Sequence, residues 1–240
     1  MRIINRVFCC AAALAALAAP VAPVAASADD STAAGVSVGT FGLGVQVEKP
    51  LQDGRAGLRV VTGNYTLNAN SSSSGVNYNA QAKLSNVAVL GELHPNAGAF
   101  RISAGYVFGG SQITATGVPS GQTFTINGQT YNNTQLTQLD GAIKLGSAPV
   151  LMIGWGGGKA RKGGMQFTAD LGAAFYSPST SLTPTYGANA NDPNVGINNP
   201  NSQTYAQFQS NLAQAQADFQ NSVGALRTYP VLSLGVATRF

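Results

Sequence analysis

Charged side chains are scarce in this chain. They make up 9% of its 240 residues, whereas a soluble domain usually carries about 25%. A soluble protein of this length would expose a large wet surface with too few charges to cover it. After Ala28 the sequence also lacks any apolar run near the roughly 20 residues of a membrane-spanning helix, which excludes a helical membrane protein.

Cysteine and histidine are almost as rare. The two cysteines, Cys9 and Cys10, lie near the amino terminus, and His94 is the only histidine. His94 stands beside Pro95 in an expected turn, and no inward-facing strand position supplies a nucleophile for it to activate. Histidine and aspartate do not cluster as metal ligands do. We therefore predict that the protein is not an enzyme, holds no cofactor and no metal, and uses His94 structurally.

The amino terminus has the pattern of a secretory signal peptide. Arg2 and Arg6 precede an apolar run from Val7 to Ala19, and Ala26 to Ala28 are the small residues that signal peptidase recognises. A retained anchor is the weaker alternative, because the run has about 13 residues and an anchor needs about 20. Cleavage after Ala28 removes both cysteines and leaves one domain, residues 29–240. Subtracting Arg2 and Arg6 from 13 basic residues leaves 11 against 9 acidic ones, which does not indicate nucleic-acid binding.

Alternation of apolar and small residues is what the sequence does have. From Phe100 to Gly109 and from Met165 to Tyr176, every second residue is apolar and the others are mostly small or polar. That period of two is typical of β-strands with one apolar face. A closed barrel pairs every backbone hydrogen-bonding group without water, so it suits an exported chain with few charges. We predict an all-β fold, an antiparallel transmembrane β-barrel of about eight strands.

Seven segments have clear strand patterns. They are Val36 to Lys49, Gly57 to Leu67, Tyr78 to Leu93, Phe100 to Gly109, Ala142 to Trp155, Met165 to Tyr176 and Tyr229 to Phe240. Bacterial single-chain barrels normally have an even number, so we take Ser179 to Tyr186 as the eighth strand. That choice puts the long segments Asn68 to Asn77 and Ser111 to Leu139 on the periplasmic side, against the usual rule. Leaving it out places the amino terminus outside, so the sequence leaves the sidedness open.

The last strand carries a resemblance to known proteins. Tyr229 to Phe240 alternates and ends on Phe240, which resembles the assembly signal of Gram-negative outer-membrane β-barrels. The mature chain as a whole is similar to the small OmpA-like, OmpX-like and OmpW-like barrels. The resemblance implies an outer-membrane location, contact with lipid and lipopolysaccharide, and recognition by the barrel-assembly machinery through Phe240.

Aromatic residues are expected to mark the two membrane interfaces. In each of the two sharpest strands, two phenylalanines stand eight positions apart. Eight residues span about 26 Å of strand, or about 20 Å of height once the strand tilts. We assign to these girdles Phe41, Phe100, Phe108, Trp155, Phe167, Phe175 and Phe240.

Six charged residues fall on the inward faces of the predicted strands. They are Glu48, Arg59, Glu92, Arg101, Lys144 and Asp170. Unpaired charges in a narrow lumen are costly, whereas a neutral, hydrogen-bonded set is tolerable. We hypothesise a salt-bridged plug in which Arg101 pairs with Glu92. The resemblance points the same way, since some of those small barrels fill the lumen with such networks.

The connections contain two further expected elements. Thr123 to Gly128 predicts a hairpin that projects from the wall. Apolar residues at spacings of three and four predict an amphipathic helix over 204–226. We expect this helix to pack on the barrel rim, with pore gating or partner binding as the alternative.

The function that follows is a non-enzymatic outer-membrane barrel with a structural or surface-interaction role and a surface partner of unknown kind. Two alternatives stay open at this point. One is a small passive channel for apolar or small polar solutes. The other is a soluble periplasmic lipid-binding barrel.

Overall fold

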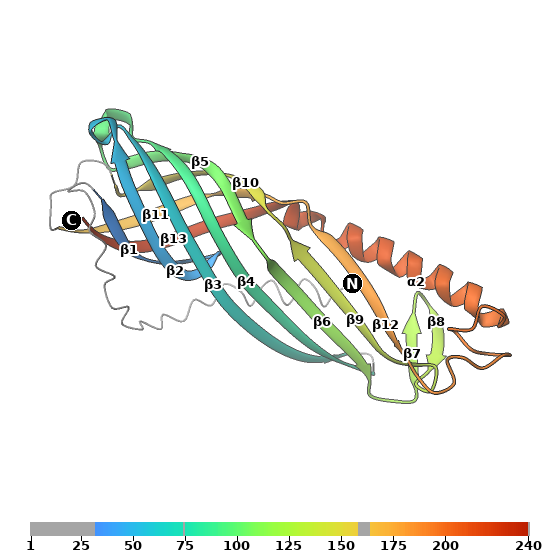
Figure 1. The fold of residues 1–240 in the computed structure, drawn as a ribbon. Helices are drawn as coiled ribbons and strands as arrows, with labels where there is room; N and C mark the ends of the chain where they lie inside the picture. Colours follow the sequence, from blue (N-terminus) through green and yellow to red (C-terminus); the bar gives the residue numbers. More distant parts are fainter. Residues whose placement is uncertain (1–31, 74, 158–163, 240) are drawn as a thin grey trace.

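The computed structural model describes residues 32–73, 75–157 and 164–239. The predicted signal peptide with its cleavage after Ala28, and the terminal Phe240, lie outside the described residues. The molecule is elongated and has two parts, a ring of strands and a sheet that continues from it (Figure 1). We call these parts the ring and the extension.

The ring contains eight antiparallel strands. They are β1 (Ala33–Gly39), β2 (Gly42–Leu51), β3 (Ala56–Ser73), β4 (Val76–Leu93), β5 (Phe100–Gly109), β10 (Ala148–Trp155), β11 (Met165–Phe175) and β13 (Thr228–Arg239). Each pairs with the next in that order, and β13 pairs with β1 to close the ring. The predicted antiparallel barrel of eight strands is confirmed.

The extension grows from β3 and β4. β2 accompanies β3 only as far as Asn64, and β5 accompanies β4 only back to Asn86, so the two strands leave the ring there as a long hairpin. Three strands then add to β4 in the order β6 (Ser111–Pro119), β9 (Leu136–Leu145) and β12 (Ser179–Tyr186). The separate hairpin of β7 (Thr123–Ile126) and β8 (Gln129–Asn132) and the helix α2 (Gln203–Ser222) complete it.

The missing eighth strand lies at the amino terminus. The predicted strand Val36 to Lys49 is two strands, β1 and β2, joined by a tight turn at Thr40 and Phe41. Ser179 to Tyr186 does form a strand, β12, but it belongs to the extension and not to the ring. The prediction of its place was therefore wrong, although the number of ring strands was right.

This arrangement resolves the conflict over sidedness. The β2–β3 connection through Gln52–Gly54 and the β4–β5 connection through Pro95–Ala97 are single 3₁₀ turns at one end of the ring, where Ala33 also pairs with Arg239. The β3–β4 hairpin, the β5–β10 excursion and the β11–β13 excursion all emerge at the other end. The long segments thus share one side of the barrel, and both ends of the strand series share the opposite side.

Two segments differ from their prediction. Asn68 to Asn77 is not a loop, because most of it continues β3 and β4 as a paired hairpin whose residues from Asn64 to Ser72 are exposed on both faces. Ala142 to Trp155 is not one strand. It is interrupted at Gly146 and Ser147, where the chain passes from β9 in the extension to β10 in the ring.

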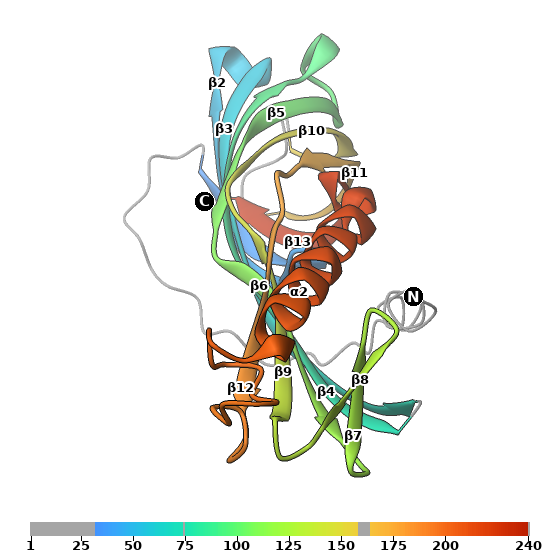
Figure 2. The same cartoon turned by 90° about the vertical axis from the view of Figure 1, so that its right-hand side faces the viewer.

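The predicted helix is confirmed, and it lies along the extension (Figure 2). Ser202 caps its amino end, where the Ser202 hydroxyl accepts a hydrogen bond from the Thr204 backbone N–H at 3.2 Å. After Ser222 a short 3₁₀ turn, Gly224–Arg227, leads into β13. The carboxyl end of the helix reaches the ring, where Val223 and Leu226 join the apolar core inside it.

Glutamines of α2 also cover one edge of the extension. Gln220 Oε1 accepts from the Thr180 N–H at 3.1 Å, and Gln216 Oε1 accepts from the Leu182 N–H at 2.7 Å. Gln216 Nε2 donates in return to the Thr180 carbonyl at 2.9 Å. These bonds satisfy the outer backbone groups of β12, which would otherwise form an open sheet edge.

The extension has an apolar core of its own, distinct from the interior of the ring. Its buried members include Phe124, Tyr131, Leu136 and Phe208. Phe208 of α2 is fully buried, with its ring edge-on to Tyr131 at a centroid distance of 5.2 Å. The extension is therefore a small folded unit with its apolar residues inside.

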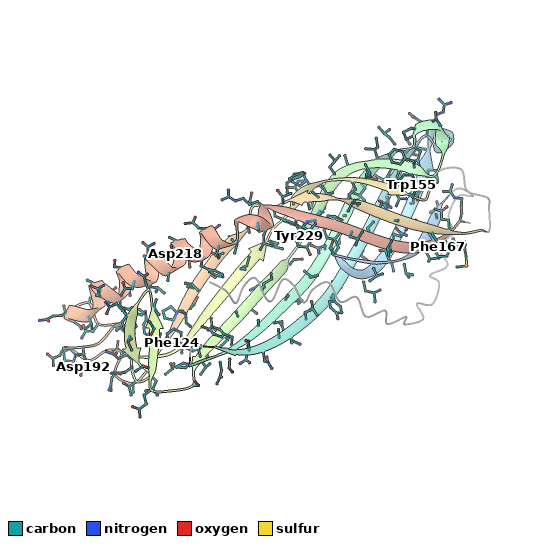
Figure 3. All side chains as sticks on the ribbon, turned by 180° about the vertical axis from the view of Figure 1, so that it is seen from behind. Phe124, Trp155, Phe167, Asp192, Asp218 and Tyr229 are labelled. Atoms are coloured by element: carbon teal, nitrogen blue, oxygen red, sulfur yellow. The ribbon has the colours of Figure 1, made fainter. Side chains whose placement is uncertain are left out.

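The outer wall of the ring has the opposite character. Large apolar side chains are exposed all round it, among them Leu58, Val89, Ile102, Leu151, Leu171 and Leu234. Trp155 and Phe167 project from the end of the ring that lies away from the extension (Figure 3). No helix in the described part of the chain is long and apolar enough to cross a bilayer.

Candidate functional site

Charged side chains gather inside the ring, at the end that bears the short turns. Five of the six residues predicted for the lumen are there and are at most 4% exposed: Glu48, Arg59, Glu92, Arg101 and Asp170. They come from β2, β3, β4, β5 and β11. We call this set, together with Arg239 of β13, the ionic layer.

Asp170 is the centre of the ionic layer. Arg59 donates to its carboxylate through Nη1 at 2.8 Å and Nη2 at 3.1 Å. Arg101 donates from the other side through Nη2 at 2.8 Å and Nε at 3.1 Å. Asp170 therefore accepts two forked, charge-assisted contacts, the geometry in which arginine binds carboxylate most strongly.

Glu92 has a secondary place in the network. Its Oε1 lies 2.7 Å from Arg59 Nε, a close ion-pair contact whose angle does not make a hydrogen bond, and 3.5 Å from Arg101 Nε. The predicted pairing of Arg101 with Glu92 is thus present, but the principal partner of Arg101 is Asp170. Arg101 Nη1 also donates to the Gly156 carbonyl at 2.9 Å, which ties the β10–β11 connection to the network.

The ionic layer is electrically balanced. Glu48 lies 4.0 Å from Arg101 and 3.6 Å from Arg239, so three arginines face three carboxylates. Arg239 is 7% exposed and was not among the residues predicted for the lumen, although its strand pattern places it on the small and polar face. Balance matters because one buried charge without a partner costs several kcal/mol.

Lys144 does not belong to the ionic layer. It is exposed on β9, where its strand neighbours are Gln112 and Ser179 of the extension. The prediction was wrong because it treated Ala142 to Trp155 as one strand. In β9 the odd-numbered residues Ile143 and Leu145 are buried, whereas in β10 the even-numbered ones are, so the phase shifts at Gly146 and Ser147.

Above the ionic layer, toward the extension, apolar side chains fill the lumen. We call this set the apolar layer: Phe41, Leu90, Val107, Val150, Met152 and Val231. The space between the two layers amounts to about 20 Å³ and is lined by Arg59, Asp170 and Met152 among others. Such a volume holds about one water molecule. The salt-bridge network is therefore confirmed as one half of the filling, and the apolar half was not foreseen.

The predicted girdle residues fall in different places. Phe108, Trp155, Phe167 and Phe175 are between 47% and 77% exposed on the outer wall. Phe100 is half-buried, edge-on to Trp155 at a centroid distance of 5.0 Å.

Phe41 is a correction to the girdle. It is 9% exposed and stacks on Tyr229 inside the ring at a centroid distance of 6.4 Å. Its place in the tight β1–β2 turn directs it into the lumen, because there the strand alternation is interrupted. Phe240 lies outside the described residues.

His94 sits beside the ionic layer in the β4–β5 turn. It is 2% exposed, and its Nε2 lies 3.8 Å from Glu92 Oε2. The sequence showed it only as a single histidine next to Pro95. With Glu48 of β2 and with Glu92, it forms a cluster of three potential ligand atoms. His94 and Glu48 are 46 residues apart, and no pattern in the sequence indicates that they meet.

The comparisons with known proteins support the fold. The chain is similar to the crystal structure of CarO2 of Acinetobacter baumannii, with a TM-score of 0.53 and 18% identity over 87% of this chain and 98% of that one. It is also similar to the crystal structure of CarO of the same organism, with a TM-score of 0.51 and 16% identity over 87% and 97%. These neighbours support a β-barrel class and do not single out the OmpA-like, OmpX-like or OmpW-like barrels. No protein-family model matches the chain, and no curated protein matches its sequence.

Proposed function

We propose that this chain is an integral outer-membrane β-barrel with a closed lumen, and that its role is structural or interaction-based and not enzymatic. The observation that carries the proposal is the filled interior of the ring. An ionic layer and an apolar layer succeed each other along the lumen and leave a cavity of about 20 Å³ between them. A hydrated solute needs a continuous path, and these two layers stand across it.

The outer wall supports a membrane location. It presents apolar side chains around a ring in which each strand pairs on both sides, the arrangement that lipid requires. In β3 the eight residue steps from Ala56 to Asn64 span about 26 Å of strand and about 20 Å of height at a tilt near 40°. That height, with the side chains at its two ends, is near the apolar band of about 25 Å of outer-membrane barrels.

The sidedness of the excursions supports a surface role. Outer-membrane barrels generally have short periplasmic turns and longer extracellular loops. By that rule the extension stands outside the cell, where it meets the exterior or a partner. Lipid and lipopolysaccharide surround the ring, and Phe240 serves as the signal that the barrel-assembly machinery recognises.

Conductance in planar bilayers tests the closed lumen. We expect the purified protein to insert without discrete conductance steps, while a known porin reconstituted in parallel conducts. Regular single-channel steps from the wild-type protein would instead support the small passive channel. Arg59→Ala is the matched variant, because it opens the ionic layer at Asp170 and should raise the frequency of leak events if the plug is the barrier.

Cysteine labelling on intact cells tests the sidedness. The described residues contain no cysteine, so single cysteines can be introduced at exposed positions at either end, Gln122→Cys in the extension and Arg55→Cys in a short turn. A membrane-impermeant maleimide should label Gln122→Cys on intact cells and Arg55→Cys only after the outer membrane is permeabilised. The opposite pattern would contradict the proposed orientation.

Extraction with alkaline carbonate separates the barrel from the soluble alternative. An integral barrel stays in the membrane pellet because its wall is in contact with hydrocarbon. Release into the supernatant would favour the periplasmic lipid-binding barrel.

A further inference from the structure

Three potential ligand atoms converge at the edge of the ionic layer. One carboxylate oxygen each from Glu48 and Glu92 and one imidazole nitrogen of His94 lie within 4.8 Å of one another, and all three residues are buried. They come from β2, from the end of β4 and from the turn that follows it. The fold therefore assembles a His and two acidic residues that are dispersed in the sequence.

The hydrogen bond of His94 determines which nitrogen is available. His94 Nδ1 lies 3.1 Å from the Gly98 carbonyl oxygen. A carbonyl can only accept, so Nδ1 carries a proton, and in the neutral imidazole the lone pair is then on Nε2. Nε2 is buried and has no hydrogen-bond partner among the described residues. Metal-binding histidines are oriented in this way, with the other ring N–H donated to a carbonyl or carboxylate.

In Glu92 and in Glu48, one carboxylate oxygen faces Arg59 or Arg101 and the other does not. Glu92 Oε1 faces Arg59, whereas Glu92 Oε2 faces His94 and has no hydrogen-bond partner in the part of the chain that the structure describes. Glu48 Oε2 faces Arg101, whereas Glu48 Oε1 has no hydrogen-bond partner there. Buried polar atoms are normally paired, and each unpaired one costs about 1–3 kcal/mol. One oxygen of each carboxylate and one imidazole nitrogen lie within 4.8 Å of one another, and such a group of donor atoms can bind a cation.

The separation of His94 and Glu92 is close to that of two ligands on a small tetrahedral ion. His94 Nε2 and Glu92 Oε2 are 3.8 Å apart, too far for a hydrogen bond. Two ligands of one zinc ion, each about 2.0–2.1 Å from the metal, lie about 3.4 Å apart at the tetrahedral angle. A shift of a few tenths of an ångström would bring the pair to that separation.

Gly157 leaves room beside the donor set. Its φ is +84°, and a Cβ there would lie 2.8 Å from Glu48 Oε1 and 2.9 Å from His94 Cε1. Only glycine permits the backbone to approach the carboxylate and the imidazole so closely in this conformation.

We propose that Glu48, Glu92 and His94 bind one divalent transition-metal cation, with Zn²⁺ as the ion that the donor set fits best. One imidazole and two carboxylates supply three ligands and leave a fourth position for water, a common zinc arrangement. Ca²⁺ and Mg²⁺ require six or more oxygen ligands and fit poorly. The ion fastens the β4–β5 turn to β2 at the turn end of the barrel.

Arg239 is the competitor for this site. Its Nη2 lies 3.6 Å from Glu48 Oε1 and has no hydrogen-bond partner within residues 32–73, 75–157 and 164–239. Since the ionic layer is already neutral, a bound dication displaces Arg239 from Glu48. Removing the arginine should therefore increase metal affinity, a result that a purely structural cluster would not give.

The test is zinc binding by the tag-free protein, purified in detergent micelles and stripped with a chelator. After loading and desalting, we expect about one zinc per chain by elemental analysis, and a higher temperature for loss of the compact form on gels. His94→Gln should lower the affinity at least about 10-fold, and Arg239→Gln should raise it. Asp218→Asn, which removes an exposed carboxylate of α2, is the control and should leave it unchanged.

Two results would overturn the proposal. One is a folded wild-type protein that keeps no zinc after desalting, and the other is a folded His94→Gln variant that binds zinc as the wild type does. If His94→Gln fails to fold, X-ray absorption at the zinc edge of the wild type decides instead. Outer-shell scattering from one imidazole ring supports the site, and a spectrum without it overturns the proposal. Neither result depends on whether the lumen conducts or on which side the extension faces.

Discussion

The ring and the extension distribute polar and apolar side chains in opposite ways: the ring buries charges and exposes apolar residues, whereas the extension buries apolar residues. Inside the ring, Arg59 and Arg101 are 2% and 0% exposed, whereas Phe167 on the outer wall is 77% exposed. In the extension, Phe208 is fully buried and the strand residues around Asn70 are exposed. Antiparallel pairing fixes only that alternate residues face opposite sides, so the same backbone geometry serves both parts. The sequence of each strand decides which side is polar.

That contrast shows what holds each part together. The extension buries apolar groups away from water, the usual source of stability in a folded domain. In the proposed membrane location, the wall of the ring gains nothing from burial away from water where it contacts lipid. The stability of the ring then depends on matched charges and on packing between the layers of its interior. The two parts should therefore respond differently to the same kind of substitution.

The largest expected effect is in the ionic layer. Arg101→Ala removes three hydrogen bonds to Asp170 and leaves the carboxylates outnumbering the arginines, which should cost about 3–5 kcal/mol. Urea unfolding in detergent, followed by heat-modifiability on gels, measures it. Arg101→Lys is the matched variant, since it keeps the charge but loses the forked geometry and should fall between the two. If Arg101→Ala unfolds at the wild-type urea concentration, the network does not stabilise the ring.

Phe208→Ala should disrupt the extension alone. The fully buried ring packs against Tyr131 and Tyr186, and its removal should cost about 3–5 kcal/mol of local stability. Limited proteolysis should then cut within the extension at protease concentrations that leave the wild type intact, while the ring keeps its compact form on gels. Loss of both parts together would show that ring and extension fold as one unit.

The sharpest comparison introduces an arginine on the outer wall of the ring and another on the exposed surface of the extension. Leu171→Arg, at mid-height on the outer wall, should cost about 2–4 kcal/mol in a bilayer. Asn70→Arg, exposed on β3 in the extension, should change stability by no more than about 0.5 kcal/mol. Unfolding in lipid vesicles measures both. Equal effects would mean that the wall of the ring does not face hydrocarbon.

The sequence predicted the ring better than the extension. Phe100 to Gly109 matches β5, and Met165 to Tyr176 exceeds β11 by one residue, because a wall with one apolar face must alternate. Asn68 to Asn77 was missed as strand because both faces of its β3 arm are exposed and nearly all residues from Asn68 to Ser73 are polar, which removes the alternation. The β1–β2 turn was missed because it replaces the usual turn residues with Thr40 and Phe41.

The site was predicted where strand phase alone determines it. Five inward charges follow from alternation within single strands. The prediction for Lys144 was wrong because the inward-facing positions change from odd to even between β9 and β10, at a strand break that the sequence does not mark. The contact of His94 with Glu48 depends instead on the order of strands around the ring. Which strands become neighbours is a property of the whole barrel and leaves no signal in any one segment.

The pairing of Ala33 with Arg239 has a consequence for biogenesis. β1 and β13 form one seam, so the cylinder stays open along β1 and β11 until the residues of β13 have been synthesised and delivered. The extension, formed by residues between Asn64 and Leu226, includes neither partner of that seam. The extension can therefore assemble without β13, whereas the ring cannot close until β13 is in place.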